Sequence, residues 1–300
     1  MNPVPTKQLY IGIGLAVLAT IIWSGNFIIA RGIATRIPPV SLAFYRWATA
    51  SLIMLPLAWK KFGQEKQVVL QNKQHIFWTS LTGVTLFNTL VYFAGHYSPA
   101  INLALIGTTS SPVFAIALAA IFLNEKITPL RITGLLICIA GIVYLIAQGS
   151  WEKLKAFHFS VGDVLILLGA FSFAVYNILV RKKAKGISPM NFLFVVFTAG
   201  TILLIPFFLW EVFTTPAVTW SGDLLLIILY LGAGTSVIAF LCWNVAISRL
   251  GAARTALFGN LIPLFAALEA VWLLGEKITA VHIIGGITII AGLVIANLKK

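Results

Sequence analysis

Long apolar runs separated by short polar segments recur along almost the whole chain of 300 residues. A helix needs about 20 predominantly apolar residues to cross a bilayer core of about 30 Å. Runs of this length predict ten membrane-spanning helices, at residues 9–30, 40–59, 75–95, 100–123, 129–147, 161–180, 190–210, 223–247, 252–274 and 279–297. We therefore expect an all-α integral membrane protein whose connections are too short to form a separate soluble domain.

One sequence pattern occurs twice, about half a chain length apart. Residues 111–115 (SPVFA) are followed, after eight residues, by 124–128 (NEKIT). Residues 262–266 (IPLFA) are followed, after the same gap, by 275–279 (GEKIT). Each residue of the first copy lies 151 positions before its counterpart in the second. This constant offset indicates an internal duplication.

The duplication divides the predicted helices into two sets of five. Residues 1–147 form the first repeat, 148–160 a connecting segment, and 161–297 the second repeat. Because five is odd, the second repeat enters the membrane from the opposite side. The sequence therefore predicts two inverted five-helix repeats related by a pseudo-two-fold axis in the membrane plane, a geometry typical of carriers that work by alternating access.

Composition and charge support this class. The chain is 60% hydrophobic and 10% charged, with a mean hydropathy of +0.99. With the N-terminus inside, fifteen Lys and Arg residues fall on the inner side and five on the outer side, namely Arg31, Arg36, Lys153, Lys155 and Lys277. We expect both termini to be cytoplasmic and the protein to lie in a bacterial inner membrane. Topology and anionic lipid account for the net charge of +13 without a nucleic-acid partner.

Several local motifs point to a known family. They are Trp23-Ser24-Gly25-Asn26-Phe27, Phe44-Tyr45-Arg46, and the doubled spacing Pro112…Glu125 and Pro263…Glu276. With them the whole chain resembles the EamA-type transporters of the drug/metabolite transporter superfamily. The resemblance implies two five-helix repeats and gradient-driven export or exchange of small metabolites, often amino acids, without ATP. One departure is the segment 173–176 (FAVY) in the sixth predicted helix, which lacks the Trp-Gly pair, so the two halves cannot line a site identically.

Polar and aromatic residues at helical spacing mark helix faces turned away from lipid, because unsatisfied polar groups in hydrocarbon are costly. Asn88, Tyr92 and His96 recur every four residues, and the offset of 151 relates Tyr92 to Trp243. The set predicted to line a substrate cavity is Trp23, Asn26, Asn88, Tyr92, His96, Thr108, Ser111, Tyr176, Asn177, Trp243, Asn244 and Asn260. This mostly aromatic lining, with amides, hydroxyls and little fixed charge, suits neutral or zwitterionic solutes with apolar parts.

These side chains also have structural interpretations. Serine and threonine in membrane helices usually bond to their own backbone. Tyr92 and Trp243 can pack or lie in an interfacial belt, and His96, near the outer end, can be a solvated residue rather than a proton carrier. We expect specificity where the two copies differ, as at Tyr92 against Trp243 and Asn26 against Tyr176.

Prolines and charged pairs recur at equivalent positions. Pro112 and Pro263 each remove a backbone hydrogen bond inside a helix, which predicts kinks that shape the helices and open or close the pathway. The pairs Glu125-Lys126 and Glu276-Lys277 stand at helix ends, where we interpret them as caps and loop anchors.

Two ionisable residues fall inside predicted spans. Arg46 can snorkel outward, meet a lipid headgroup, or attract a substrate carboxylate. Glu269 lies deeper and is the candidate for proton coupling, because desolvation favours the protonated carboxyl. Since nine residues turn a helix by about 900°, Glu269 and Asn260 both face a cavity only if the Pro263 kink resets the helix.

Glycines form a further repeat-related pattern. Gly134 and Gly141 in the fifth predicted helix match Gly285 and Gly292 in the tenth, and each pair lies on one helix face. Such faces permit close helix packing. We expect these two helices to pack together or to form a dimer seam, so that the protein is a monomer or a weak homodimer.

The expected function is that of a secondary transporter that exports small metabolites, with apolar or aromatic amino acids as the leading class. The alternatives are a carrier, in either direction, of another neutral or zwitterionic metabolite, and a channel, which the short, interrupted polar clusters favour less. We expect no enzyme activity, cofactor or metal site, since the sequence has no Walker motif, no His-x-x-x-His pair and no Gly-x-Ser-x-Gly.

Overall fold

A computed structural model of the chain describes residues 6–98, 100–156, 160–182, 186–274 and 279–298. Its elements are α1 (Thr6–Gly32), α2 (Pro39–Gln71), α3 (Lys73–Ser80), η1 (Leu81–Leu86), α4 (Phe87–Tyr97), α5 (Ala100–Leu123), α6 (Pro129–Ile146), α7 (Trp151–Lys155), α8 (Val161–Arg181), α9 (Pro189–Thr214), α10 (Gly222–Leu229), η2 (Tyr230–Ile238), α11 (Ala239–Leu250), α12 (Ala252–Leu257), η3 (Phe258–Leu261), α13 (Ile262–Leu274) and α14 (Ala280–Asn297). The described part of the chain is thus all-helical, as expected.

Helices cover each of the ten predicted ranges, with three differences. α2 continues through a polar stretch to Gln71 instead of ending near residue 59. The third and eighth ranges each contain a π-helical segment, η1 and η2, where the backbone hydrogen bonds widen by one residue. The ninth range is broken by the 3-10 turn η3. The hydropathy pattern along the sequence predicted none of these three differences.

Seven helices in the described part are long and apolar enough to cross a membrane, judged by length and composition. Three further apolar helices are shorter, over Pro129–Leu145, Ala252–Ala266 and Ile283–Asn297. These helices support an integral membrane protein.

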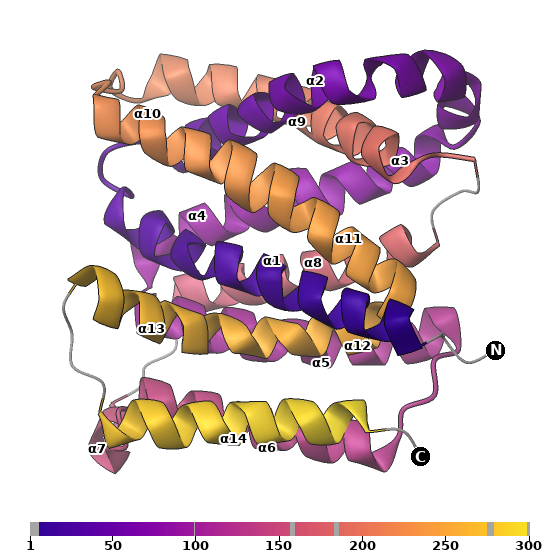
Figure 1. Cartoon of the computed structure of the whole chain (residues 1–300). Coiled ribbons are helices and arrows are strands. Elements are labelled where there is room, and N and C mark those ends of the chain that lie inside the picture. The colour runs from indigo at the N-terminus through magenta and orange to yellow at the C-terminus, as the bar shows by residue number, and fades with distance from the viewer. Residues whose placement is uncertain (1–5, 99, 157–159, 183–185, 275–278, 299–300) are drawn as a thin grey trace.

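The helices lie roughly parallel or antiparallel to one another in stacked rows (Figure 1). α6 and α14 form one edge of the molecule, while α2, α3 and α9 form the opposite edge. α1, α4, α5, α8, α11 and α12–α13 fill the space between. α1 begins at the same end of the bundle as α14 ends (Figure 1).

α6 and α14 pack through the predicted glycines. A Cβ added to Gly134 would lie 2.4 Å from the carbonyl oxygen of Gly292, and one on Gly141 would lie 3.1 Å from that of Gly285. The contacts run in opposite order along the two helices, so α6 and α14 are antiparallel. The expectation that these helices pack together is confirmed, and their glycine faces are occupied within one chain.

α2 and α9 cap one another. Glu211, near the end of α9, accepts hydrogen bonds from the backbone N–H groups of Val40 and Ser41 at the start of α2, at 3.1 and 2.6 Å. Glu65, in the last part of α2, accepts from the N–H of Ser188 at the start of α9, at 2.9 Å. N–H groups in the first turn of a helix have no acceptor within that helix, and these carboxylates supply one. The carboxylates also lie at the positive end of the helix dipole, where a negative charge is stabilising. The reciprocal arrangement also makes α2 and α9 antiparallel.

Residues at equivalent positions of the two halves also contact each other directly. The hydroxyls of Ser51 and Thr201, 150 positions apart, lie 3.3 Å from each other. The thiol of Cys138 donates to the carbonyl oxygen of Ile289, 151 positions away, at 3.3 Å. Equivalent positions of the two halves thus meet at these two places.

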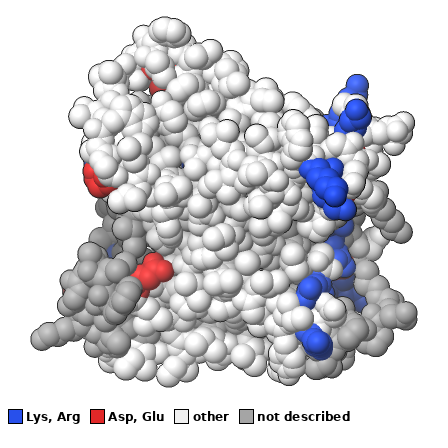
Figure 2. Space-filling view, turned by 45° about the horizontal axis from the view of Figure 1, so that its top comes forward, with Lys and Arg blue, Asp and Glu red and all other residues white. Residues whose placement is uncertain are grey.

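Charge is divided between the two ends of the bundle. On the face drawn in Figure 2, Lys and Arg gather at the end where α1 begins, and Asp and Glu lie toward the other end. The basic end includes exposed lysines on α1, α2 and α3 and just after α8, namely Lys7, Lys60, Lys61, Lys66, Lys73 and Lys182. The wide band between the two ends carries uncharged side chains on this face, as lipid contact requires.

Candidate functional site

A small cavity lies in the middle of the bundle, among α1, α2, α4, α5, α8, α11 and the broken helix α12–η3–α13. Its volume is about 60 Å³, which is room for a few water molecules. It is lined by Trp23, Asn26, Arg46, Phe87, Asn88, Gly107, Thr108, Ser111, Pro112, Ile166, Ala170, Phe173, Trp243, Ala256, Gly259 and Ile262. In this conformation the central cavity is too small to hold a whole amino acid.

Arg46 organises the polar side of the central cavity. Its side chain is 1% exposed. Its Nη1 donates to the Oδ1 atoms of Asn26 and Asn88, at 2.9 and 2.8 Å, and to the hydroxyl of Tyr92 at 2.9 Å. Its Nε donates to Ser236 Oγ at 2.7 Å. The guanidinium is therefore held inside the bundle by uncharged acceptors from three neighbouring elements.

Aromatic rings form another part of the cavity lining. Trp23 and Trp243 lie with ring centroids 4.9 Å apart, and Phe173 meets the edge of Trp23 at 5.7 Å. The indole N–H of Trp23 donates to the carbonyl oxygen of Thr235 at 2.7 Å, at the π-helical segment η2. Phe87 stacks on Phe173 at 4.6 Å. Hydrogen bonding and ring packing together hold these rings as an apolar wall of the cavity.

A second layer of polar residues supports this wall. Trp243 donates its indole N–H to Asn177 Oδ1 at 2.9 Å, and Tyr176 donates to Asn244 Oδ1 at 2.8 Å. The ring of Tyr176 packs directly on Gly83 in η1, where an added Cβ would lie 2.1 Å from it. Only glycine permits this approach, so Gly83 of η1 makes room for the Tyr176 ring of α8.

A larger, open pocket of about 900 Å³ lies at the bundle end where α1 and α9 finish. Its lining includes His96, Phe93, Arg36, Trp210 and the capping residue Glu211. One helical stripe links it to the central cavity, because Asn88 lines the cavity, Tyr92 lies one turn further, and His96 lines the open pocket. The buried Tyr92 therefore stands between the two spaces.

An ion pair borders the open pocket. Arg36 Nη1 lies 2.6 Å from Asp223 Oδ2, and Arg36 Nη2 donates to Ser221 Oγ at 2.9 Å. The hydrogen bond to Asp223, and then the attraction of its charge, raise the pKa of Arg36 above its usual value. The pair connects the loop before α2 to α10. Because both residues are exposed, it contributes little to the free energy of unfolding.

Glu269 lies outside the central cavity, between α1 and α13. It accepts a hydrogen bond from the hydroxyl of Ser24 on α1. Tyr230 experiences the charges of both Glu269 and Arg46, so these three residues share one neighbourhood. Glu269 thus contacts α1, which carries Trp23 and Asn26 of the cavity, but is not among the described lining residues.

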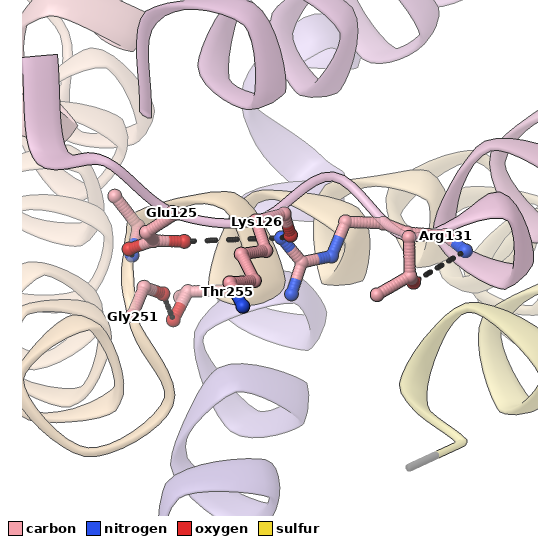
Figure 3. Close-up of polar contacts among 7 residues, drawn as sticks. Glu125, Lys126, Arg131, Gly251 and Thr255 are labelled. Atoms are coloured by element: carbon pink, nitrogen blue, oxygen red, sulfur yellow. Dashed lines mark hydrogen bonds and ion pairs between the residues drawn. The ribbon is translucent and has the colours of Figure 1, made fainter. Parts of the chain in front are cut away.

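Another polar cluster lies just after the end of α5, at the start of α12 and at the end of the bundle where α1 begins (Figure 1). Figure 3 shows its side chains. Glu125 Oε1 accepts from the backbone N–H of Ala252 at 3.2 Å, at the start of α12, and Glu125 lies 3.9 Å from Arg131. Gly251 has a φ of 93°, and a Cβ there would lie 2.9 Å from Glu125. The interpretation of Glu125 as a cap and loop anchor is therefore confirmed. Glu276 and Lys277 lie outside the described residues.

The structure divides the predicted site residues into three groups. Seven line the central cavity: Trp23, Asn26, Asn88, Thr108, Ser111, Trp243 and Pro112. Four lie directly behind the lining: Tyr92, Tyr176, Asn177 and Asn244. The remaining four lie elsewhere: His96 in the open pocket, fully buried Asn260 beside Cys138, Pro263 at the second position of α13, and Glu269 against Ser24.

Sequence reasoning missed the inward position of Arg46 and the lining roles of Phe87 and Phe173. Snorkelling or lipid contact of Arg46, two of the three sequence interpretations, is wrong because the side chain is buried among Asn26, Asn88 and Tyr92. One signal was present in the sequence: Phe173 falls where the two halves differ. Over the described ranges, no group of three or more His, Cys, Asp or Glu side chains is placed to hold a metal ion.

Sequence comparison places these features among known proteins. The model of the EamA-like transporter family matches residues 10–147 and 160–298. An uncharacterized transporter of Archaeoglobus fulgidus is 32% identical over 286 residues, covering 95% of this chain and 97% of that protein. A probable amino-acid metabolite efflux pump of Escherichia coli is 24% identical over 289 residues, 94% of this chain and 93% of that protein.

Two further similarities extend the comparison. A probable terminal-alkyne amino-acid exporter of Streptantibioticus cattleyicolor is 28% identical over 218 residues, 72% of this chain and 70% of that protein. A protein of known crystal structure shares the fold with a TM-score of 0.78 and 18% identity, covering 97% of this chain and 96% of that chain. The family match extends over nearly the whole chain, and the protein belongs to the EamA-like transporter family.

Proposed function

We propose that this protein is a secondary transporter that exports small metabolites, foremost amino acids with apolar or aromatic side chains, by alternating access. The observation that carries this proposal is the small cavity in the middle of the bundle, which is lined both by aromatic rings and by Arg46 with amides. The names of two relatives, an amino-acid metabolite efflux pump and a terminal-alkyne amino-acid exporter, support the same class.

The proposed architecture has ten spanning helices, arranged as two inverted repeats over residues 1–147 and 161–297 with 148–160 between them. The antiparallel pairs α6/α14 and α2/α9 support it, as do the contacts between residues 150 and 151 positions apart. In this arrangement the three shorter apolar helices also cross the membrane.

Both termini are proposed to face the cytoplasm of a bacterial cell, with the protein in the inner membrane. The support is the concentration of Lys and Arg at the end where α1 begins (Figure 2). The open pocket around His96 then faces the outside, and the Glu125 junction faces the inside.

Alternating access requires a barrier on each side of the central cavity. On the outer side we assign this role to Tyr92, which is held between Asn88 and His96 by its hydrogen bond with Arg46. On the inner side the Glu125 contact ties the end of α5 to the start of α12. Pro112, which lines the cavity inside α5, and Pro263, which follows η3, are positioned to let these segments move.

Proton coupling is proposed for Glu269. Protonation of a carboxyl inside the membrane removes a charge that is costly to desolvate, so a proton gradient can bias the conformational equilibrium. The polar groups near it include Ser24, which donates to the carboxylate, and Tyr230, which is close enough to feel the charges of both Glu269 and Arg46. A change at Glu269 is then transmitted through α1, which also carries Trp23 and Asn26 of the cavity.

An exporter or uptake carrier of another neutral or zwitterionic metabolite is the alternative. A channel is less favoured, because Tyr92 separates the central cavity from the open pocket. A monomer is favoured over a dimer joined through α6 and α14, because the glycine faces of those helices already pack on each other. We assign no enzymatic step.

The test is transport by the purified protein in liposomes preloaded with a single unlabelled amino acid. We expect accumulation of the labelled form of Phe, Leu or Val by counterflow, above that of protein-free liposomes. Repeating the assay with a pH gradient measures coupling. Failure of every amino acid in a complete labelled panel to move would refute the proposed substrate class.

A further inference from the structure

Arg46 brings a positive charge into the central cavity, and among the described residues no Asp or Glu lies within ion-pair distance of it, although ion pairs occur at Arg36 and Arg131. A buried charge is costly unless an opposite charge or a complete set of hydrogen bonds compensates it. The cavity therefore holds a cation that is stabilised by hydrogen bonds to neutral groups, and by no opposite charge within hydrogen-bond distance among the described residues.

The hydrogen bonds around Arg46 leave one donor of Asn88 unpaired within the described part of the chain. The Oδ1 atoms of Asn26 and Asn88 are both directed at the guanidinium. The Nδ2 donor of Asn88 is buried without a hydrogen-bond partner among the described residues. Because a buried unpaired donor costs free energy, this side of the cavity is complementary to a group that supplies only acceptors.

The fold itself does not require these polar groups. With the offset of 150 that relates the starts of α2 and α9, Arg46 corresponds to Val196, and with the offset of 151, Asn88 corresponds to Ala239. Val196 and Ala239 are both fully buried and apolar. The same scaffold position is thus filled by an apolar residue in the second half, which points to a ligand rather than packing as the reason for the charge.

We propose that Arg46 and Asn88 bind the carboxylate of the transported molecule, and that the substrate class is small monocarboxylates with an apolar or aromatic body. This inference rests on the proposed function, because it takes the central cavity as the substrate site. The aromatic wall of Trp23, Phe173 and Trp243 receives the body of the molecule. Among the described residues that line the cavity there is no Asp or Glu, so an amino group gains no ionic partner from them and is not required.

The chemistry of the two groups fits this assignment. A guanidinium offers parallel N–H donors that match the two oxygens of a carboxylate, and such charge-assisted hydrogen bonds are stronger than neutral ones. A carboxylate that takes the place of the Asn88 Oδ1 contact would also pair the Asn88 N–H group. Since the cavity holds only a few waters here, binding is coupled to an outward shift of the surrounding helices.

The first test measures binding to the detergent-solubilised full-length protein by calorimetry, with four probes. These are 3-phenylpropionate, phenylalanine, 3-phenylpropionamide and acetate. We expect the first two to bind within about threefold of each other. The amide, which lacks the charge, and acetate, which lacks the apolar body, are expected to bind at least about tenfold more weakly. Equal binding of acid and amide, or of acetate and 3-phenylpropionate, would overturn the proposal.

The second test uses Asn88→Asp, which places an internal carboxylate next to Arg46 without changing the side-chain shape. We expect this variant to keep or exceed the melting temperature of the parent protein and to lose binding of 3-phenylpropionate by at least about tenfold. The matched control is Arg36→Gln, which removes an exposed arginine outside the cavity and is expected to bind like the parent. Unchanged binding by Asn88→Asp contradicts the assignment.

Arg46→Lys separates charge from geometry. The variant keeps a cation but loses the fork of donors, so 3-phenylpropionate is expected to bind more weakly while the protein still folds. Binding and liposome transport then test different claims. Carboxylate binding without transport of any panel compound would support this inference and refute the proposed function. Transport that does not distinguish acid from amide would support the proposed transport function and refute the carboxylate assignment.

Discussion

Trp243 donates its indole N–H to the amide oxygen of Asn177 at 2.9 Å, and both residues are the copies, 151 positions later, of Tyr92 and Asn26. In the first half the Tyr92 hydroxyl lies 3.5 Å from Asn26 Oδ1, with the same separation of 66 residues along the chain. The two halves therefore contain equivalent contacts beside the central cavity. Arg46 donates hydrogen bonds to Asn26 and Tyr92, the pair in the first half. The two halves therefore differ at the site itself.

Trp243→Ala tests the aromatic wall. We expect transport of aromatic amino acids to fall about threefold to tenfold, because one ring of the wall is lost. The protein should still fold, since Trp23, Phe173 and Phe240 remain packed together. Transport in liposomes and the elution profile in detergent measure the two effects. Trp59→Ala, at an exposed tryptophan of α2, is the control, and loss of folding in Trp243→Ala alone would make Trp243 a packing residue.

Gly134→Ala tests the close packing of α6 and α14. The added methyl group would meet backbone atoms of Gly292 and Ala296 at 2.4 Å, so the helices must move apart. We expect the free energy of unfolding to fall by about 1–3 kcal/mol, measured by denaturation in detergent. Gly14→Ala, where nothing lies within 4 Å of the added atom, should leave stability unchanged or raise it slightly. Equal stability of the two variants would contradict this packing.

Glu211→Gln tests the reciprocal capping of α2 and α9. The amide keeps one acceptor but loses the charge that faces the start of α2, and its NH₂ group points at a backbone donor. We expect a loss of about 1–2 kcal/mol in the free energy of unfolding. Glu152→Gln, at an exposed glutamate of the short helix α7, should change stability by less than about 0.5 kcal/mol.

Tyr92→Ala tests the outer barrier. The substitution removes the side chain that separates the central cavity from the open pocket around His96. We expect the cavity to become accessible from outside the membrane. The measurement is labelling of Thr108→Cys, a cavity position, by a membrane-impermeant thiol reagent applied to intact cells.

The labelling experiment requires a background without native thiols, so Cys138→Ala and Cys242→Ala are introduced first. In that background Thr108→Cys should label slowly when Tyr92 is present and at least about tenfold faster with Tyr92→Ala. Tyr92→Phe keeps the bulk of the ring and is the matched control. Equal labelling rates in the alanine and phenylalanine variants would place the barrier elsewhere.

Glu269→Gln tests proton coupling. The amide imitates the protonated carboxyl and cannot release a proton, so stimulation of transport by a pH gradient should disappear while counterflow without a gradient continues. Ser24→Ala removes the hydroxyl that donates to Glu269 and should alter the pH dependence without abolishing it. Gradient-stimulated transport by Glu269→Gln equal to that of the parent would exclude this residue as the coupling site.

The sequence by itself determined the class of the protein and the positions of its helices. Apolar runs of bilayer length must be helical, because a backbone in hydrocarbon has to satisfy its own hydrogen bonds. Helices accordingly cover all ten predicted ranges, and Gly134 and Gly141 packed against Gly292 and Gly285 as their spacing indicated. These features follow from local composition and from the duplication. Both are properties of the linear sequence and need no knowledge of tertiary contacts.

The linear sequence did not predict where a helix changes its winding and so turns different residues toward the cavity. The π-helical segments η1 and η2 and the 3-10 turn η3 change which residues share a face, and no hydropathy pattern marks them. Regular spacing predicted Asn260 in the cavity lining, whereas its neighbours Gly259 and Ile262 line the described cavity and Asn260 is buried. The sequence also aligned Asn26 with Tyr176, whereas the hydrogen bonds make Asn177 its counterpart.

Only the tertiary structure decided the place of Arg46. Along the chain it is a charge near the beginning of an apolar helix, where snorkelling to the surface is the usual outcome. In the folded protein Asn26, Asn88 and Ser236, brought by α1, α4 and η2, surround it with acceptors. Whether a buried charge is tolerated depends on partners that are distant in sequence, and the packing of helices selects those partners.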